Sequence, residues 1–153
     1  MASPRMALEK ASTNIQTEHG ELMQQISQLD TALDGLICYA EVYADLAAMQ
    51  RVLQAGSWLD NWLPDHFLRE EETLFVAAAR LNPEVSGFVR EMKHQHTDIG
   101  VRLQAFCKLM QQVETTSDIE QSVTALKQEG KQLTNFMAAH MGAEERRFGG
   151  LKG

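Results

Sequence analysis

The sequence predicts an all-α protein, specifically an antiparallel up-down-up-down four-helix bundle. Three observations carry this prediction. Apolar residues recur at alternating steps of three and four residues over long stretches, which is typical of a bundle helix. Only three prolines interrupt 153 residues. The breaks between the periodic stretches are short, and short connections join antiparallel neighbours.

We call the line of core-facing residues along each helix its seam. The first helix is expected from about Thr13 to Leu36, followed by a turn. Its seam contains one histidine among aliphatic residues: Ile15, His19, Leu22, Ile26, Leu29 and Leu33.

The second helix is expected from about Tyr43 to Arg80. Pro64 lies inside it and removes a backbone donor, so it either kinks this helix or begins a new one. The kink is favoured because the apolar pattern continues in phase across the proline. The seam residues are Val52, Leu59, Leu63, His66, Glu70, Thr73 and Ala77.

Two further helices complete the bundle. Asn82-Pro83-Glu84 is a helix-start signal, because a cap residue precedes a proline in the first turn. The segment 117–120 (Ser-Asp-Ile-Glu) fits a capping box for the last helix. The third seam is Val85, Val89, Met92, His96, Ile99, Leu103, Phe106, Met110 and Val113, and the fourth is Ile119, Val123, Leu126, Gly130, Leu133, Met137, His140 and Glu144.

Composition predicts one domain: a flexible segment over residues 1–12, the bundle over 13–148 and a flexible tail over 149–153. A formal net charge of −7 argues against a nucleic-acid partner or an anionic membrane surface. No apolar run approaches bilayer length, and the first twelve residues lack the apolar core of a signal peptide. Cys38 and Cys107 form no paired motif. These features predict a soluble, cytoplasmic protein.

Four of the five histidines fall on the four predicted seams, one per helix: His19, His66, His96 and His140. Two seams also carry a carboxylate four residues after the histidine, at Glu70 and Glu144, and this spacing places both side chains on one helix face. His94 serves as an internal control. His94 lies two residues from the seam residues Met92 and His96, which is about 200° around the helix, so we expect it on the surface.

Six polar groups in one core demand an explanation. Burying an unpaired polar group costs about 2–7 kcal/mol, and an isolated carboxylate costs far more. Metal ions offset this cost by coordination. One tetrahedral zinc uses only four ligands, so six groups indicate two metals, and mixed imidazole and carboxylate ligation suits iron or manganese. If Glu70 and Glu144 bridge, each metal receives two histidines.

The motif formed by a lone histidine in helix one, His66-Phe-x-x-Glu70-Glu71, Gln95-His96 and His140-x-x-x-Glu144-Glu145 resembles the hemerythrin-like (HHE cation-binding) family over about residues 13–148. The resemblance implies a four-helix bundle around a non-haem di-iron centre, bridged by an oxo or hydroxo group, that binds or reacts with dioxygen or nitric oxide. It carries the metal-ligand role to His19, His66, Glu70, His96, His140 and Glu144. Manganese or a mixed metal pair remains an alternative.

The chain departs from the oxygen-carrying members of that family at two places. They have a further histidine where this chain has Met92, and their last carboxylate corresponds to Glu145. The seam favours Glu144, and Glu145 stays open. With Met92, both irons are left with open positions unless another residue fills the gap; Tyr39 and Tyr43 are candidates by chemistry alone. Four histidines and two carboxylates also resemble the iron-centre repair proteins, whose cysteine-bearing N-terminal region is missing here.

Three classes of function follow. The first is a module that binds or senses dioxygen or nitric oxide, or handles iron. The second is a small di-iron redox enzyme, an oxidase, peroxidase or nitric-oxide-reducing protein. The third is a metal-free interaction bundle. We expect a small ligand such as dioxygen, nitric oxide or peroxide, and the sequence identifies no protein partner. A ferritin-like site would need two Glu-x-x-His motifs, and the chain has one.

Overall fold

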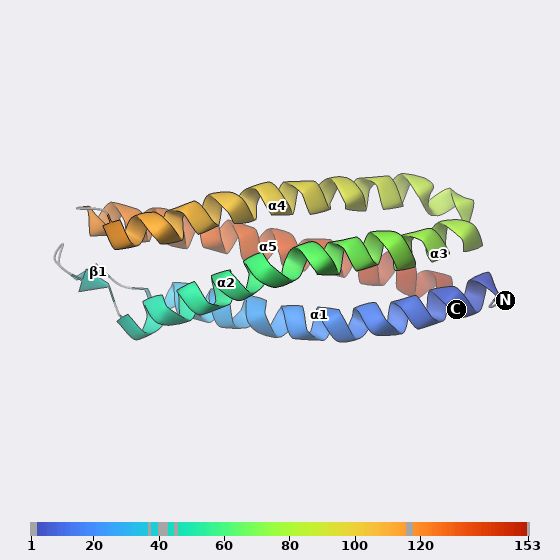
Figure 1. Ribbon diagram of the computed structural model, residues 1–153, viewed down its shortest axis with the longest axis horizontal. Helices are drawn as coiled ribbons and strands as arrows, with labels where there is room; N and C mark the ends of the chain where they lie inside the picture. The colour runs from blue at the N-terminus through green and yellow to red at the C-terminus, as the bar shows by residue number, and fades with distance from the viewer. Residues whose placement is uncertain (1–2, 37, 40–42, 45, 116–117, 153) are drawn as a thin grey trace.

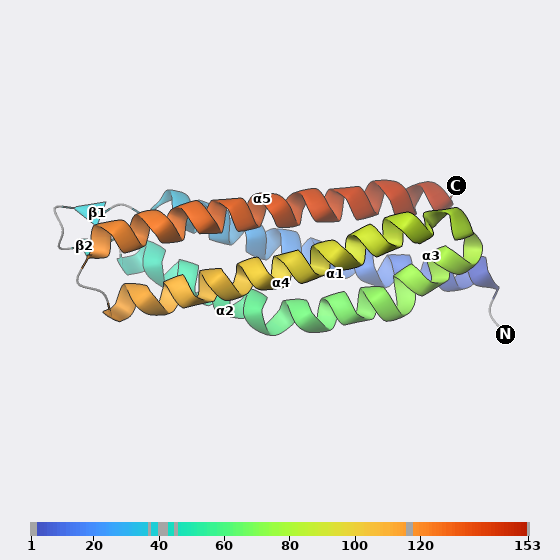
Figure 2. The same ribbon diagram turned by 90° about the horizontal axis from the view of Figure 1, so that it is seen from above.

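The computed structural model describes residues 3–36, 38–39, 43–44, 46–115 and 118–152. They form an antiparallel up-down-up-down four-helix bundle, as the sequence predicts (Figures 1 and 2). The first bundle helix is α1 (Pro4–Asp34), and the second is a continuous helical segment made of α2 (Leu46–Arg69), the π-helical turn η1 (Glu70–Leu74) and α3 (Phe75–Leu81). The third is α4 (Ser86–Thr115), preceded by the 3₁₀ turn η2 (Pro83–Val85), and the fourth is α5 (Ile119–Lys152). Both chain ends lie at the same end of the bundle.

The first and last helices, α1 and α5, are longer than the sequence predicts. α1 begins at Pro4, nine residues before the predicted start at Thr13, and residues 4–12 form its first turns. The signal for this start is Ser3-Pro4, because the Ser3 hydroxyl accepts a hydrogen bond from the Met6 backbone N–H at 3.2 Å and proline suits the first helical position. Leu8 is fully buried there. At the other end α5 continues through residues 149–152 of the predicted tail, and Phe148 is buried.

The second bundle helix confirms one expectation and corrects another. The chain stays helical across Pro64, so the alternative that this proline begins a new helix is wrong. The π turn at Glu70–Leu74 is not predicted from the sequence. It inserts one extra residue, which rotates the following side chains by about 100°. As a result Thr73, predicted on the seam, is exposed, and Leu74 is buried in its place.

The connections carry local caps. The Asn82 side chain accepts a hydrogen bond from the Glu84 N–H at 3.0 Å, which confirms the predicted start of the third helix. At α5 the Asp118 carboxylate accepts from the Gln121 N–H at 3.0 Å; Ser117, the predicted cap, lies outside the described residues. Between α1 and α2, the short strands β1 (Cys38–Tyr39) and β2 (Tyr43–Ala44) pair antiparallel at the end of the bundle opposite the termini.

The core consists of two apolar clusters separated by a polar layer. The larger cluster, around Leu29, Leu59, Phe106 and Leu126, fills the end of the bundle that carries the hairpin. The smaller cluster, around Leu8, Phe75, Met92 and Phe148, fills the end that carries the termini. Buried histidine and glutamate side chains lie between them.

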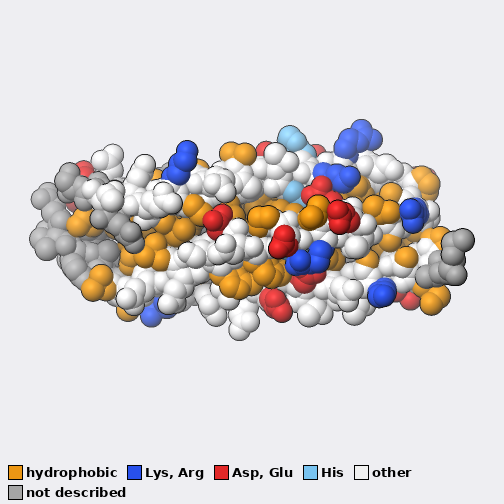
Figure 3. Space-filling model, in the orientation of Figure 1, with side chains coloured by type: hydrophobic (Ala, Val, Ile, Leu, Met, Phe, Trp, Pro, Cys, Tyr) orange, Lys and Arg blue, Asp and Glu red, His pale blue; other side chains and the backbone are white. Residues whose placement is uncertain are grey.

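The surface carries both signs of charge. Acidic and basic side chains are interleaved over the right-hand half of the face shown in Figure 3. None of the described helices has the length and apolar run needed to cross a membrane.

Candidate metal centre

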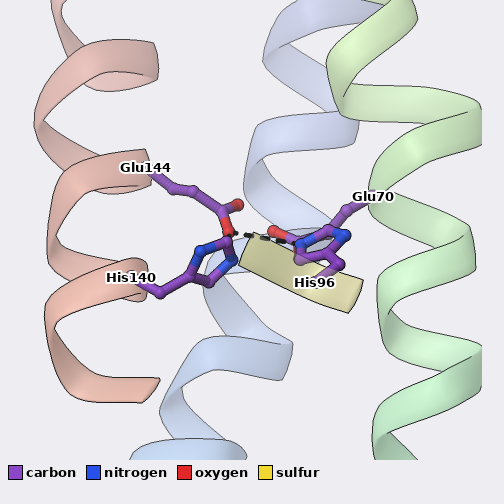
Figure 4. Close-up of side chains that lie close together, drawn as sticks. All are labelled: Glu70, His96, His140 and Glu144. Atoms are coloured by element: carbon purple, nitrogen blue, oxygen red, sulfur yellow. Dashed lines mark ion pairs between the residues drawn. The ribbon is translucent and has the colours of Figure 1, made fainter. Parts of the chain in front are cut away.

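Each bundle helix contributes one histidine or one histidine and one glutamate to the polar layer. The six residues predicted from the seams are all buried there, with exposed fractions between 0 and 5%. They are His19 on α1, His66 on α2, Glu70 at the start of the π turn, His96 on α4, and His140 and Glu144 on α5. Figure 4 shows side chains from three of these segments pointing toward one another.

Glu70 lies at the middle of the layer. Its Oε2 lies 3.2 Å from Nε2 of His19, and its Oε1 lies 3.1 Å from Nε2 of His66. The same Oε1 lies 3.2 Å from Nε2 of His96. One carboxylate therefore faces imidazoles from three helices at once.

Glu144 completes the layer from α5. Its Oε1 contacts Nε2 of His140 and lies 3.7 Å from Nε2 of His96. The donor atoms form two groups in which all atoms lie within 4.8 Å of one another. One group is His19, His66 and Glu70; the other is Glu70, His96, His140 and Glu144. Glu70 belongs to both.

These buried groups lack hydrogen-bond partners. Among the described residues, seven buried side-chain nitrogen and oxygen atoms have none, and all seven belong to these six residues. Native proteins pair the large majority of buried polar atoms, because each unpaired one costs about 1–3 kcal/mol. The concentration of these unpaired atoms in one layer fits a set of metal ligands arranged around a cation. The seven atoms are His19 Nδ1, His66 Nε2, Glu70 Oε1, His96 Nε2, His140 Nε2, and Glu144 Oε1 and Oε2.

The outward nitrogens of His66, His96 and His140 are hydrogen-bonded by the neighbouring helix, and that of His19 lies near Glu145 without a hydrogen bond. Every Nδ1 lies near a side-chain oxygen, and these contacts run around the bundle from α1 to α2, from η1 to α4, from α4 to α5 and from α5 back to α1. A donating Nδ1–H leaves the lone pair on Nε2, which faces inward. The contacts are Glu18 Oε1 to His66 (3.2 Å), Glu71 Oε2 to His96 (3.0 Å), Gln95 Oε1 to His140 (2.8 Å) and Glu145 Oε1 to His19 (3.4 Å).

Each of these outer oxygens comes from a residue next to an inner one in the sequence. Glu18 precedes His19, and Glu71 follows Glu70. One step along a helix turns the side chain by about 100°, so the neighbour of a core-facing residue points at the adjacent helix. Glu18 and Gln95 are not predicted as partners from the sequence; their position directly beside a seam histidine is the signal that could have identified them.

Aromatic rings enclose the imidazoles. The Phe67 ring stacks on His96 with centroids 3.9 Å apart and an angle of 10° between the planes. Trp62 stacks on His66 at 4.7 Å and 14°. Phe75 covers His96 at 5.4 Å. These rings exclude water from the layer and fix the ring planes, and such a surrounding shell controls solvent access to a metal.

The two carboxyl groups divide their charge unequally. Burial opposes ionisation of Glu70, but interactions with Glu144 and with His19, His66 and His96 outweigh it and hold its pKa well below the ordinary value. Burial, and then the adjacent Glu70 carboxylate, raise the pKa of Glu144 well above its ordinary value. Without a cation, Glu144 therefore keeps its proton to a higher pH than an ordinary glutamic acid does.

The fourth imidazole is kept neutral. Burial, reinforced by the charge of His96, lowers the pKa of His140 to about 3. A neutral imidazole is the form that binds a metal, so this nitrogen is available without a proton having to leave it near neutral pH.

The remaining sequence candidates lie apart from the inner layer. Glu145 is 53% exposed at its side chain and contacts the outward nitrogen of His19, whereas Glu144 faces inward. His94 is 72% exposed at its side chain beside Asp98, which confirms the prediction of a surface histidine. Met92 is buried in the smaller apolar cluster.

The two tyrosines lie too far along the bundle to supply the metal ligand that is missing because Met92 stands in place of a histidine. Tyr43 lies in β2, just before the start of α2 at Leu46, and about 30 Å of helix separates Leu46 from His66. Tyr39 pairs with Tyr43 in the same hairpin. Their side chains lie outside the described part of the structure.

A small cavity of about 20 Å³ reaches the layer between α1 and α5. His19 and Glu144 line its inner side, Ile15 and Phe148 give it apolar walls, and Glu145 lies on it as well. A site of roughly 10–15 Å³ holds one water molecule, so this space suits a molecule of two or three atoms.

A comparison with protein families identifies one match. The family described as the hemerythrin HHE cation binding domain matches residues 10–151, nearly the whole chain. No match was found among curated proteins or among solved structures. With an antiparallel four-helix bundle and a buried cluster of four histidines and two glutamates that could hold a cation, this chain belongs to the hemerythrin HHE cation-binding domain family.

Proposed function

We propose that the buried layer is a di-iron centre and that the protein uses it to bind a diatomic gas, dioxygen or nitric oxide. His19, His66, Glu70, His96, His140 and Glu144 would hold the metal. The observation that carries the proposal is the set of seven unpaired buried atoms, all of them on these six residues.

The orientation of the imidazoles supports metal ligation over a hydrogen-bonded core. Metal-bound histidines characteristically donate their other ring N–H to a carboxylate, a carbonyl or water. His66 and His96 have such a carboxylate at 3.2 and 3.0 Å, and His140 has an amide oxygen at 2.8 Å. In a core without metal, Nε2 would instead need its own donor.

The donor grouping supports two ions. The two clusters share only Glu70, whose Oε2 lies near His19 of the first group and whose Oε1 lies near both His66 of the first group and His96 of the second. A shared carboxylate of this kind is suited to bridge two cations. The proton that Glu144 carries in the metal-free protein would leave when the cations bind, because metal ligands must be deprotonated.

The donor chemistry supports iron. Imidazole nitrogen mixed with carboxylate oxygen, and no thiolate in either group, suits iron and manganese better than a structural zinc. Iron held by these residues would, in its reduced state, be able to supply electrons to a diatomic molecule. The three-residue group would leave more positions open than the four-residue group, and the small cavity reaches the first group through His19 and the second through Glu144.

The protein's own side chains would then shape the reaction. Phe67, Phe75 and Trp62 keep water away from the imidazoles. The apolar walls of the cavity at Ile15 and Phe148 admit a small neutral molecule more readily than an ion.

A second candidate, a small redox enzyme acting on dioxygen, peroxide or nitric oxide, is favoured by one observation. Met92 offers no nitrogen ligand and lies within the apolar cluster beside the layer. Both groups therefore retain open positions, which favours reaction over protected reversible binding.

Metal loading tests the proposed centre. Reconstituted with iron(II) under nitrogen, the wild-type protein should bind about two irons per chain, the number that two donor groups accommodate. His66→Ala and His140→Ala should each lose iron. His94→Ala, which removes an exposed imidazole, is the matched control and should load like the wild type. Full loading of His66→Ala, or an iron-free wild type, would contradict the proposal.

Gas titration separates the two candidates. The iron(II) protein is mixed with dioxygen or nitric oxide, and its visible spectrum is followed. A spectrum that reverts when the gas is removed supports binding. Continuous consumption of gas or peroxide in the presence of a reductant supports the enzyme.

A further inference from the structure

A line of stacked aromatic rings connects the buried layer with the protein surface. Trp58, Trp62 and His66 follow one another at four-residue intervals on α2, which places them on one face of the helix. The rings of Trp58 and Trp62 lie 4.7 Å apart at 20°, and those of Trp62 and His66 lie 4.7 Å apart at 14°. Both indoles are partly buried.

The outer end of this line opens on a groove. Trp58 forms part of the wall of a surface groove of about 440 Å³ between α1 and α2. Arg51 adds a positive charge to this groove, and its other polar groups are amides and hydroxyls, among them Gln25, Gln28, Thr31 and Gln54. A groove of this volume is within the range that holds small organic molecules.

The composition of the line is selective. The chain has only two tryptophans, and both lie in it. Indole is the aromatic side chain that loses an electron most readily after phenol, and the tyrosines lie at the hairpin end of the bundle. The other described rings stacked on an inner imidazole, Phe67 and Phe75, are phenyl rings that resist oxidation.

We propose that Trp62 and Trp58 carry single electrons between the centre and the surface groove. The inference rests on the proposed iron centre. The rate of electron transfer falls steeply with the distance between donor and acceptor. Because each ring contacts the next, the electron moves in several short steps, which are faster than one long step. In the direction of oxidation, a small organic one-electron acceptor in the groove, of the quinone class, gains one electron from Trp58. Trp58 regains an electron from Trp62, Trp62 regains one from the iron, and one iron(II) becomes iron(III). A reduced donor in the groove sends the electron the opposite way.

Flash oxidation tests this route. A ruthenium polypyridyl complex in solution is oxidised by a light pulse and an electron acceptor, and it then takes one electron from a partly exposed indole. The tryptophan radical is followed by its transient absorption in the protein loaded with iron(II) and with zinc, which donates no electron. The radical should decay at least about tenfold faster with iron, the change produced by about 1.4 kcal/mol of activation free energy.

Three variants locate the route, and the iron content of each is measured first. In Trp62→Phe the radical forms on Trp58, and iron should no longer accelerate its decay. In Trp58→Phe the radical forms on Trp62, beside His66, and iron should still accelerate it. Phe136→Leu removes a partly buried ring on α5 that lies under Arg102, outside the line and outside the polar layer, and it should behave like the wild type.

The outcomes separate the relay from the centre. An iron-loaded Trp62→Phe that keeps the accelerated decay, or a Phe136→Leu that loses it to the same degree, would overturn the relay and leave the centre standing. A wild type that binds no iron would overturn the proposed centre and the relay together.

Discussion

Three of the four inner imidazoles are oriented by a hydrogen bond from outside the layer. One helix supplies the oxygen that holds the histidine of the next, for His66, His96 and His140, and Glu145 lies 3.4 Å from the outward nitrogen of His19. The inner residues were predictable because they interrupt an apolar seam. The outer ones were not, since Glu71 and Arg69 look like any charged pair on a solvated face. Arg69 in fact donates to Glu18 at 2.7 Å and holds it beside His66.

Glu71→Gln should weaken iron binding about 10–100-fold, because it removes the charged acceptor that orients His96. Glu72→Gln makes the same charge change one residue later, at an exposed side chain, and should bind like the wild type. Competition with a chromophoric chelator measures both affinities. Equal losses in the two variants would show that only the overall charge matters.

Iron uptake should release a proton that depends on Glu144. Burial and the adjacent Glu70 carboxylate raise the pKa of this carboxyl in the metal-free protein, so it keeps its proton at pH values where an ordinary carboxyl has lost it. Metal expels that proton, and the affinity therefore rises with pH by about tenfold per unit over the range in which one proton is released. Calorimetry in two buffers of different ionisation enthalpy counts the protons. Glu144→Gln should release about one fewer, and an unchanged count would contradict the assignment.

At the scale of helices, the seam pattern predicts the second bundle helix correctly up to Glu70, where the π turn begins, and not in the π turn itself. The seam pattern places His66 and Glu70 one turn apart, and this spacing holds. After Glu70 the extra residue shifts the phase, so Leu74 and not Thr73 enters the core. The five-residue hydrogen bond from Phe75 N–H to Glu70 C=O depends on packing between helices, and a single sequence does not show it. The early start of α1 had a local signal in Ser3-Pro4.

Helix packing predicts opposite effects for two glycines. A Cβ on Gly130 would lie 2.6 Å from Leu33 Cδ1 and 2.9 Å from Phe106 Cε2, two fully buried side chains. We expect Gly130→Ala to cost about 1–3 kcal/mol through overpacking, more than the helix gains from alanine. Gly100→Ala, also inside a helix, meets nothing within 4 Å and should stabilise by about 0.5–1 kcal/mol. Urea unfolding of the metal-free protein measures both, and a stabilised Gly130→Ala would contradict the packing.

For the whole molecule, the fold class and the position of the layer follow from the sequence because periodicity and anomaly coincide. Four seams define four antiparallel helices, and the histidine on each seam lies at the same level along the bundle axis. The hairpin and the cavity between α1 and α5 depend on how the backbones meet, so they have no signature of their own. The layer divides the core into two apolar clusters. Its unpaired groups are a cost to the fold, which a bound cation would offset.

Removing metal should therefore destabilise the protein. At a free-iron concentration about 100 times the Kd, one bound ion stabilises the folded state by about 2.7 kcal/mol. For a chain of this size that corresponds to roughly 5–10 °C in Tm. Calorimetric scans with iron and with a chelator measure the difference. The double variant His66→Ala/His140→Ala should show none, and an equal shift in that variant would point to binding elsewhere.

The most direct measurement is anomalous diffraction at the iron edge from crystals of the iron-loaded protein. The account predicts two peaks on either side of Glu70, one near His19 and His66 and the other near His96, His140 and Glu144. A single peak would contradict the shared role of Glu70. No peak within reach of these six side chains would contradict the proposed centre itself.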